Sequence, residues 1–189
     1  CILKGYRKLP PAHAMEFDLN SGGKKIWKYW ELPSDNSNQS VKPNFLLDRY
    51  EGLLENSVRK QLIADVPVGV LLSGGVDSSL ITAMAVRSSK KIKTFTIRFP
   101  GHTGVDETEH ARLIAKHFNT EHIELEASSA SAELIPLLAR QYDEPIVDSS
   151  MIPTYLVSNL ICNHCKVALG GDGGDELFGG YMHHSRLLW

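Results

Sequence analysis

The chain has 189 residues with 20 Lys or Arg against 22 Asp or Glu, and a formal net charge of −2 argues against a nucleic-acid-binding surface. Hydrophobic residues make up 42% and charged residues 22%, as in ordinary globular proteins, so a disordered or fibrous chain is excluded. No apolar run reaches the roughly 18 residues of a membrane helix, no basic-then-apolar leader opens the chain, and three cysteines are too few for a disulfide framework, so we expect a soluble, cytoplasmic protein with no membrane partner.

The first 64 residues predict three segments of different character. Residues 1–33 carry short alternating stretches broken by Pro10-Pro11 and by Ser21-Gly22-Gly23, which is typical of a β-hairpin. Residues 34–44 are polar and lack periodic apolar positions, so we expect a linker there. From residue 45 to 64 apolar residues recur at three-and-four spacing, which predicts an amphipathic helix.

Strands and helices then alternate to the end of the chain. The apolar and polar patterns predict strands over 66–72, 93–99, 122–125 and 166–169, and helices over 77–86, 106–118, 130–142 and 152–163. We expect Asp106 to cap the second of these helices. Such alternation implies right-handed crossovers, and therefore an α/β fold with an open parallel sheet and helices on both of its faces. In these sheets ligands bind beyond the carboxyl ends of the strands.

One loop at that edge, residues 73–79 (SGGVDSS), has the composition of a phosphate site. It follows a strand directly and opens a helix, so its glycines and the helix N-terminus provide backbone amides for an anion. Its three serines add hydroxyl donors without bulk. An acid beside a phosphate is repelled unless a divalent cation lies between them, so Asp77 indicates magnesium. The alternative is a tight strand-to-helix turn in which Asp77 is only a cap.

A second loop, residues 170–176 (GGDGGDE), follows the fourth strand and leads into LFGGY. Three acids fall within five positions, and their mutual repulsion costs stability unless a cation or a positive side chain compensates it. With both loops at one edge of the sheet, a magnesium ion between Asp77 and Asp175 would neutralise both acids and a bound triphosphate. The alternative is an acidic loop that faces only solvent.

These motifs resemble a known family. SGGVDSS is similar to the pyrophosphate-binding loop of the ATP pyrophosphatases, and it lacks the lysine of a Walker loop. GGDGGDELFGGY, taken with DVPVGVLLSGGVDSS, TFTIRFPG, VDETEHARLIAKHF and DEPIVDSSMIPTYL, resembles the synthetase domain of glutamine-dependent asparagine synthetase. GYRKLPPAHAMEFD, followed by YW, is similar to the end of the glutaminase domain of that family.

The resemblance implies a fold and a domain organisation. The fold would be adenine nucleotide α-hydrolase-like, a Rossmann-like sheet preceded by a short β-hairpin. Residues 1–33 would be the end of a glutaminase-type domain with its exit hairpin, 34–44 a linker, and 45–189 the N-terminal part of the ATP-binding synthetase domain. We therefore expect a fragment of a longer protein that lacks the glutaminase nucleophile domain, so Cys1 is not that nucleophile. The full-length protein could be a homodimer.

The resemblance also implies roles for particular residues. The pyrophosphate part of ATP would bind to the first loop, at Ser73, Gly74, Gly75, Val76, Asp77, Ser78 and Ser79. Adenine would lie at Leu71 and Ile97, and the ribose and α-phosphate at Gly170 and Gly171. Asp77 and Asp175 would bind Mg2+, and Asp172 would be catalytic, with Glu176 as a supporting acid. The sequence departs from the family in two places. Gly170 stands where serine is usual, so a hydroxyl contact is lost, and Asp172 stands where glutamate is frequent, so its reach differs.

The implied reaction has two steps. A carboxylate, expected to be that of aspartate, attacks the α-phosphorus of MgATP and releases pyrophosphate, and ammonia from glutamine then converts the acyl-adenylate to an amide and AMP. A base must take a proton from the ammonia, and Asp172 could do so. Two alternatives stay open: the same chemistry on a surface sugar, a β-lactam precursor or a peptide, and a nucleotide-binding module without catalysis.

Overall fold

The computed structural model describes residues 1–33, 42–98, 107–127, 132–142, 145, 146, 148 and 150–186. The chain divides into two compact units, one formed by Cys1–Val41 with Pro136–Val147 and the other by Lys42–Ile135 with Asp148–Trp189. Most of the expected linker, residues 34–41, lies outside the described residues, as does the expected cap Asp106. Residues 43 and 44, which were also expected in the linker, already belong to the first helix.

The first unit contains the expected hairpin. Strands β1 (His13–Phe17) and β2 (Lys24–Lys28) pair antiparallel, from His13 opposite Lys28 to Phe17 opposite Lys24. The Asp18 carboxylate organises the turn between them, because it accepts hydrogen bonds from the Asn20 amide at 2.8 Å and the Ser21 hydroxyl at 2.6 Å. The short polar and glycine-containing stretch in the sequence therefore forms the turn that it predicts.

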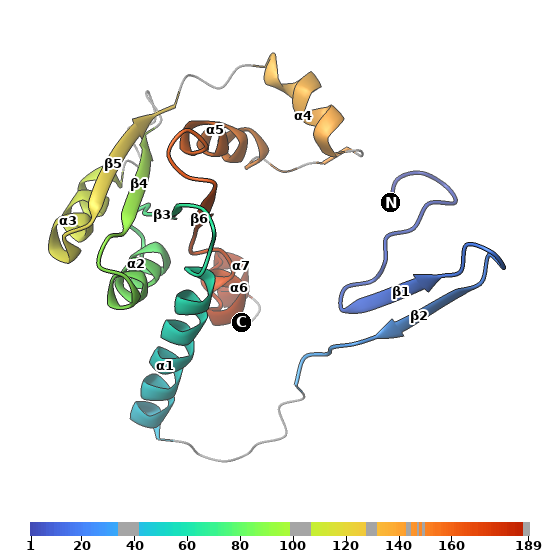
Figure 1. Cartoon of the computed structure of the whole chain (residues 1–189), viewed down its shortest axis with the longest axis horizontal. Helices are drawn as coiled ribbons and strands as arrows, with labels where there is room; N and C mark the ends of the chain where they lie inside the picture. The colour runs from blue at the N-terminus through green and yellow to red at the C-terminus, as the bar shows by residue number, and fades with distance from the viewer. Residues whose placement is uncertain are drawn as a thin grey trace. The chain divides into compact units, whose positions relative to one another are not determined.

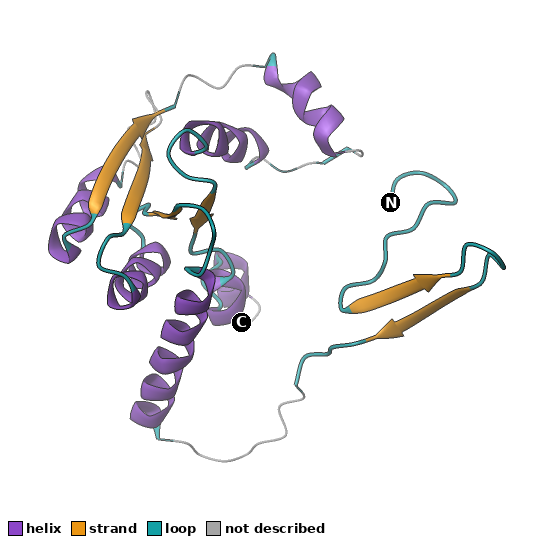
Figure 2. Cartoon of the chain, viewed as in Figure 1, coloured by secondary structure: helices purple, strands orange, loops and turns teal. Residues whose placement is uncertain are grey.

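The second unit is built on a parallel sheet of four strands in the order β5-β4-β3-β6 (Figures 1 and 2). These strands are β3 (Val68–Leu71), β4 (Lys93–Arg98), β5 (Glu121–Glu126) and β6 (Val167–Leu169). All three strand pairs are parallel, as predicted. The chain runs outward from β3 to β4 and β5 and then returns to place β6 on the other side of β3. The strand order therefore reverses between β3 and β6, which is where open α/β sheets bind ligands.

Helices cover both faces of this sheet, because successive side chains of a strand point to opposite sides. Helices α1 (Pro43–Gln61) and α2 (Val76–Ser88) share a buried cluster that includes Val58, Val70 and Met84. Helix α3 (Thr108–Phe118) packs its alanines against Leu72. Helix α5 (Met151–Ile161) packs on the opposite face through a cluster that contains Phe95 and Ile161. The predicted two-sided arrangement is confirmed.

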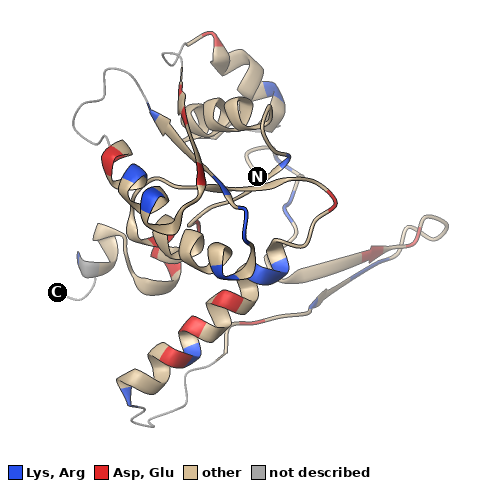
Figure 3. Cartoon of the chain, turned by 60° about the vertical axis from the view of Figure 1, so that its left-hand side comes forward, with Lys and Arg blue, Asp and Glu red and all other residues tan. Residues whose placement is uncertain are grey.

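Charged residues lie along the outside of these helices. Figure 3 shows basic and acidic residues interspersed along α1. Arg87, near the end of α2, pairs with Glu51 and Glu55 of α1 and so ties the two helices together. Among the described residues, no helix combines the length and the apolar character that crossing a membrane requires.

The end of the chain differs from the prediction. Residues 174–176 were expected in a loop, but they begin a short helix, α6 (Gly174–Phe178), which is followed by α7 (Met182–Arg186). Gly173, with φ of +92°, turns the chain just before α6, and the acids of the first turn favour its N-terminus. One further helix, α4 (Leu134–Tyr142), spans the division between the two units.

Candidate active site

The first predicted loop leaves β3 and enters α2 in a turn that needs glycine at position 74. Gly74 has φ of +97°, a backbone conformation that side chains disfavour. A Cβ atom on Gly74 would also lie 2.8 Å from the Glu107 carbonyl oxygen and 3.0 Å from the Ala111 nitrogen, so the beginning of α3 packs directly against the loop. Helix α2 begins at this turn, and the amide groups of its first turn have no partner within the helix, which makes them candidates for binding an anion.

The serine hydroxyls of this loop brace its backbone. Ser78 is buried, and its Oγ accepts a hydrogen bond from the Ser73 amide at 3.2 Å and donates to the Gly75 carbonyl at 3.1 Å. The Ser79 hydroxyl donates to the same carbonyl at 2.7 Å. The sequence suggested these hydroxyls as donors to a ligand. In the structure they hold the turn in shape, so backbone amides become the main candidates for contact with a phosphate.

Asp77 joins the two predicted loops. A Cβ on Gly171 would lie 2.8 Å from the Asp77 Cβ, and a Cβ on Gly174 would lie 2.7 to 2.9 Å from the three atoms of the Asp77 carboxylate group. No side chain fits at either position without movement. Because β3 and β6 are parallel neighbours, both loops leave the sheet at the same edge, as predicted. The glycines of the second loop thus let it close onto the acid of the first.

The remaining acids lie around this contact. The Asp172 carboxylate folds back towards the end of β6, with Oδ2 2.8 Å from the position of a Cβ on Gly170. Asp175, in the first turn of α6, packs so closely against Gly180 that a side chain at residue 180 would collide with its carboxylate. Asp77 and Asp175 are half-buried, whereas Asp172 is exposed.

Glu176 has a hydrogen-bond partner that the sequence does not indicate. The Tyr181 hydroxyl donates to Glu176 Oε1 at 2.7 Å. This hydrogen bond lowers the pKa of Glu176 and raises the pKa of Tyr181. Glu176 was suggested as a supporting acid for Asp172, but in the structure it closes the turn between α6 and Tyr181.

The acids suit a metal that arrives with a nucleotide. Among the described residues, no three His, Cys, Asp or Glu side chains come together as a metal-binding group. Magnesium commonly uses only one or two protein carboxylates and completes its coordination with phosphate oxygens and water. Asp77, whose carboxylate lies against Gly174, and Asp175, whose carboxylate lies against Gly180, are the two candidate carboxylates.

The residues suggested for adenine lie together on one face of the sheet. Leu71 of β3 and Ile97 of β4 are both half-buried and pack against the cluster beneath α5. Gly170 and Gly171 follow the end of β6, the strand beside β3. The structure therefore brings the suggested adenine, ribose and phosphate residues to the same carboxyl edge.

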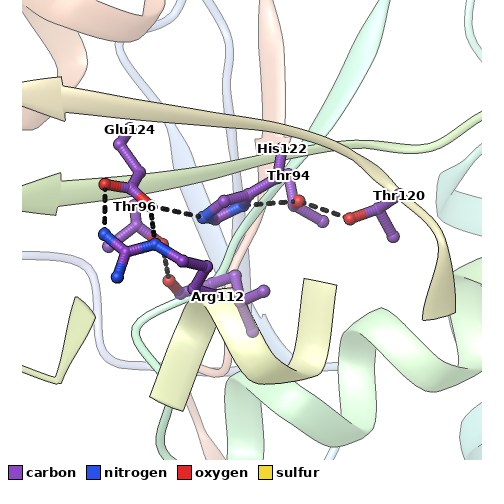
Figure 4. Close-up of polar contacts among 7 residues, drawn as sticks. Thr94, Thr96, Arg112, Thr120, His122 and Glu124 are labelled. Carbon is purple, nitrogen blue, oxygen red and sulfur yellow. Dashed lines mark hydrogen bonds and ion pairs between the residues drawn. The ribbon is translucent and has the colours of Figure 1, made fainter. Parts of the chain in front are cut away.

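Two further residues lie near the loop, although the sequence does not indicate their positions there. Glu107, in front of α3, places its Oε2 4.0 Å from the position of a Cβ on Gly75. Thr96 of β4 donates its hydroxyl to the Leu72 carbonyl at 2.5 Å, immediately before the loop (Figure 4). Glu107 belongs to the motif VDETEH, but nothing in that motif indicates which loop it meets.

The chain is similar to known proteins over most of its length. Residues 49–189 match the asparagine synthase family. A protein of Methanocaldococcus jannaschii, named provisionally as a glutamine-hydrolysing asparagine synthetase 2, is 37% identical over 97% of this chain, and asparagine synthetase 1 of Bacillus subtilis is 36% identical over 72%. The chain spans 35% and 22% of the lengths of these two relatives.

The fold has a counterpart among solved structures. A glutamine-dependent NAD+ synthetase of Acinetobacter baumannii, solved in complex with ADP, superposes with a TM-score of 0.52 at 20% sequence identity. The match covers 88% of this chain and 31% of that protein. At this identity the likeness concerns the fold, an adenine nucleotide α-hydrolase-like sheet.

Proposed function

Since the chain belongs to the asparagine synthase family, we propose that it carries the ATP site of an amide-forming ligase that converts aspartate to asparagine. The observation that carries the proposal is that Asp77 packs against Gly171 and Gly174. This contact brings the phosphate-type loop and the acidic loop together at the point where the strand order reverses. A loop that faced only solvent would not need two glycines fitted against one acid. The names of the relatives support aspartate as the carboxylate and glutamine as the source of ammonia.

The nucleotide would lie across the edge formed by β3, β4 and β6. The amides at the start of α2 and around Gly74 and Gly75 would bind the pyrophosphate part of ATP, and Leu71 with Ile97 would contact adenine. Asp77 and Asp175 would hold magnesium, which would neutralise charge on the phosphates. Gly170 and Gly171 leave room beside the α-phosphate.

Asp172 would then act on the second substrate. The aspartate carboxylate attacks the α-phosphorus and pyrophosphate leaves, after which the nitrogen of ammonia attacks the acyl carbon and AMP leaves. Asp172 is exposed at the end of β6 and would accept the proton that ammonia loses in this attack. Glu176 would support the site indirectly, by fixing the turn that follows α6.

We propose the same origin for the remaining parts of the chain. Residues 1–33 would be the end of a glutaminase-type domain with its exit hairpin, 34–44 a linker, and 45–189 the N-terminal part of the synthetase domain. Glutamine hydrolysis, a dimeric state and a cytoplasmic location would be properties of the longer protein.

Pyrophosphate release tests the proposal. With MgATP we expect release that depends on aspartate, and both Asp77→Asn and Asp175→Asn should abolish most magnesium-dependent ATP binding while the fold is kept. Asp65→Asn removes the same charge from an exposed position in the same unit, so it is the matched control. Unchanged magnesium dependence in Asp77→Asn would contradict the metal assignment. Release without aspartate would contradict the choice of substrate.

A second variant tests the phosphate loop without disturbing its packing. Gly75 has φ of −72°, and a Cβ there would meet only the Ser73 hydroxyl at 3.4 Å and Glu107 Oε2 at 4.0 Å. The Cβ of Gly75→Val should therefore fit, and its two further methyl groups should fill the space beside the amides, so that ATP binding is lost while the chain still folds. ATP binding equal to that of the parent protein would show that phosphates bind elsewhere.

A further inference from the structure

One peptide group marks the point where β3 becomes the loop. Leu72 is fully buried, and its amide donates to the Phe95 carbonyl of β4 at 2.8 Å. Its carbonyl accepts from the Thr96 hydroxyl at 2.5 Å. The next residue, Ser73, is the first of the loop, and its amide donates to the Ser78 hydroxyl at 3.2 Å.

The Leu72 carbonyl and the Ser73 amide belong to the same planar peptide group. Thr96 therefore holds one end of this plane and Ser78 holds the other. Rotation of the plane would break both hydrogen bonds, and it would disturb the bond from Ser78 to the Gly75 carbonyl that follows. The direction in which the loop leaves the sheet is thus determined by two side chains from different elements.

The position of Thr96 explains why a hydroxyl is found there. Thr96 is only 4% exposed, and a buried hydroxyl without a partner costs free energy. The register pairs Leu71 with Phe95, which places Thr96 beside Leu72. Apolar valine would pack well at such a site, so the hydroxyl is useful through the contact that it makes.

We propose that Thr96 is a positioning residue for nucleotide binding, acting with Ser78 as a clamp on the Leu72–Ser73 peptide plane. The inference rests on the proposed function, because it requires that loop 73–79 binds the phosphates. Thr96 itself does not touch the nucleotide. It orients the backbone amides that do.

Thr94 provides a control within the same strand. It is fully buried and lies on the same face of β4 (Figure 4). Its hydroxyl forms hydrogen bonds with the Thr120 hydroxyl at 2.8 Å and His122 Nδ1 at 2.9 Å, towards the opposite end of the strand from the loop. Replacing either threonine by valine removes one buried hydroxyl at nearly constant volume, but only Thr96 holds the loop.

The test measures the Kd for MgATP and the melting temperature on the full chain. Thr96→Val should weaken MgATP binding roughly 5- to 20-fold, as expected when a buried carbonyl loses its partner, and Thr94→Val should change it less than about 2-fold. Both should lower the melting temperature. Thr96→Ser keeps the hydroxyl and should restore the Kd to within about 3-fold of the parent value.

Equal Kd changes in Thr96→Val and Thr94→Val would overturn the inference, as would a Thr96→Ser variant that binds as weakly as Thr96→Val. If Thr96→Val does not fold, the pair Thr96→Ala and Thr96→Ser decides by the same comparison. Failure of the proposed function looks different: the parent protein itself would then not bind MgATP, and the inference would fall with it.

Discussion

The variant Gly174→Ala should displace the Asp77 carboxylate with little change in the stability of the fold, so it tests whether the position of this carboxylate matters for activity. Gly174 is the first residue of α6, and it lies outside the left-handed region of the backbone. Alanine therefore suits its backbone and would by itself stabilise the folded chain by about 0.5–1 kcal/mol relative to glycine. The obstacle is the Asp77 side chain, since the three atoms nearest to the new methyl group all belong to its carboxylate.

The size of the effect follows from these contacts. The methyl group would lie 2.7 to 2.9 Å from the carboxylate atoms, whereas ordinary contact begins at 3.4 Å. The carboxylate must move by about 0.5–0.7 Å, and misplacement of about 1 Å at a reacting centre can cost about 100-fold in rate. We expect pyrophosphate release to slow by about 10- to 100-fold, or about 1.4–2.7 kcal/mol. Stability should stay within about 1 kcal/mol of the parent, because the half-buried Asp77 carboxylate can still rotate away from the new methyl group.

Two other glycines serve as controls. A Cβ on Gly171 would meet Asp77 Cβ at 2.8 Å and the Ser78 nitrogen at 3.0 Å, and backbone atoms cannot rotate away. Gly171→Ala should therefore lose about 1–3 kcal/mol of stability as well as activity. Gly52 lies in α1 with no atom within 4 Å of its Cβ position, so Gly52→Ala should gain about 0.5–1 kcal/mol and keep full activity.

The measurements are urea unfolding and pyrophosphate release with MgATP and aspartate. A Gly174→Ala variant with the parent rate would show that the position of the Asp77 carboxylate does not matter for the reaction. A variant as unstable as Gly171→Ala would show that Asp77 cannot rotate in the folded chain.

Two more predictions concern single side chains. Asp172→Asn should keep the parent affinity for ATP but slow amide formation by about 100-fold with ammonia as the nitrogen source, and a parent rate would reduce Asp172 to a loop residue. Burial lowers the pKa of His122 below its ordinary value of 6.5, the charge of Arg112 lowers it further, and the charge of Glu124 acts to raise it. As the pH falls, the unfolded chain therefore takes up this proton at a higher pH than the folded chain does. The contribution of neutral His122 to the free energy of unfolding should therefore be complete above pH 6.5 and decline below it. Measured by urea unfolding, the free energy of unfolding of His122→Gln should fall less between pH 7 and pH 5 than that of the parent. An equal fall in both proteins would exclude His122 as its source.

Much of the fold could be predicted because hydrophobic periodicity is a local property. The buried run that ends at Leu72 and the spacing in α1 predict a strand and a helix without any knowledge of their neighbours. The alternation of these elements predicts a parallel sheet, and the sheet rule places both glycine-rich loops at one edge. The helix α6 was missed because five residues are too few to show a period, and its beginning depends on the left-handed turn at Gly173.

The sequence by itself therefore determined the sheet, its two-sided covering and the two loops that carry the acids. Only the tertiary structure decided how these loops meet. Gly171 and Gly174 pack against Asp77, and the Thr96 hydroxyl of β4 donates to the Leu72 carbonyl just beyond the end of the neighbouring strand β3. Such contacts join residues that are far apart in the chain, so they depend on strand register and on close packing. Strand register and close packing cannot be predicted from a local pattern of residue types, because periodicity indicates only which face of an element is buried.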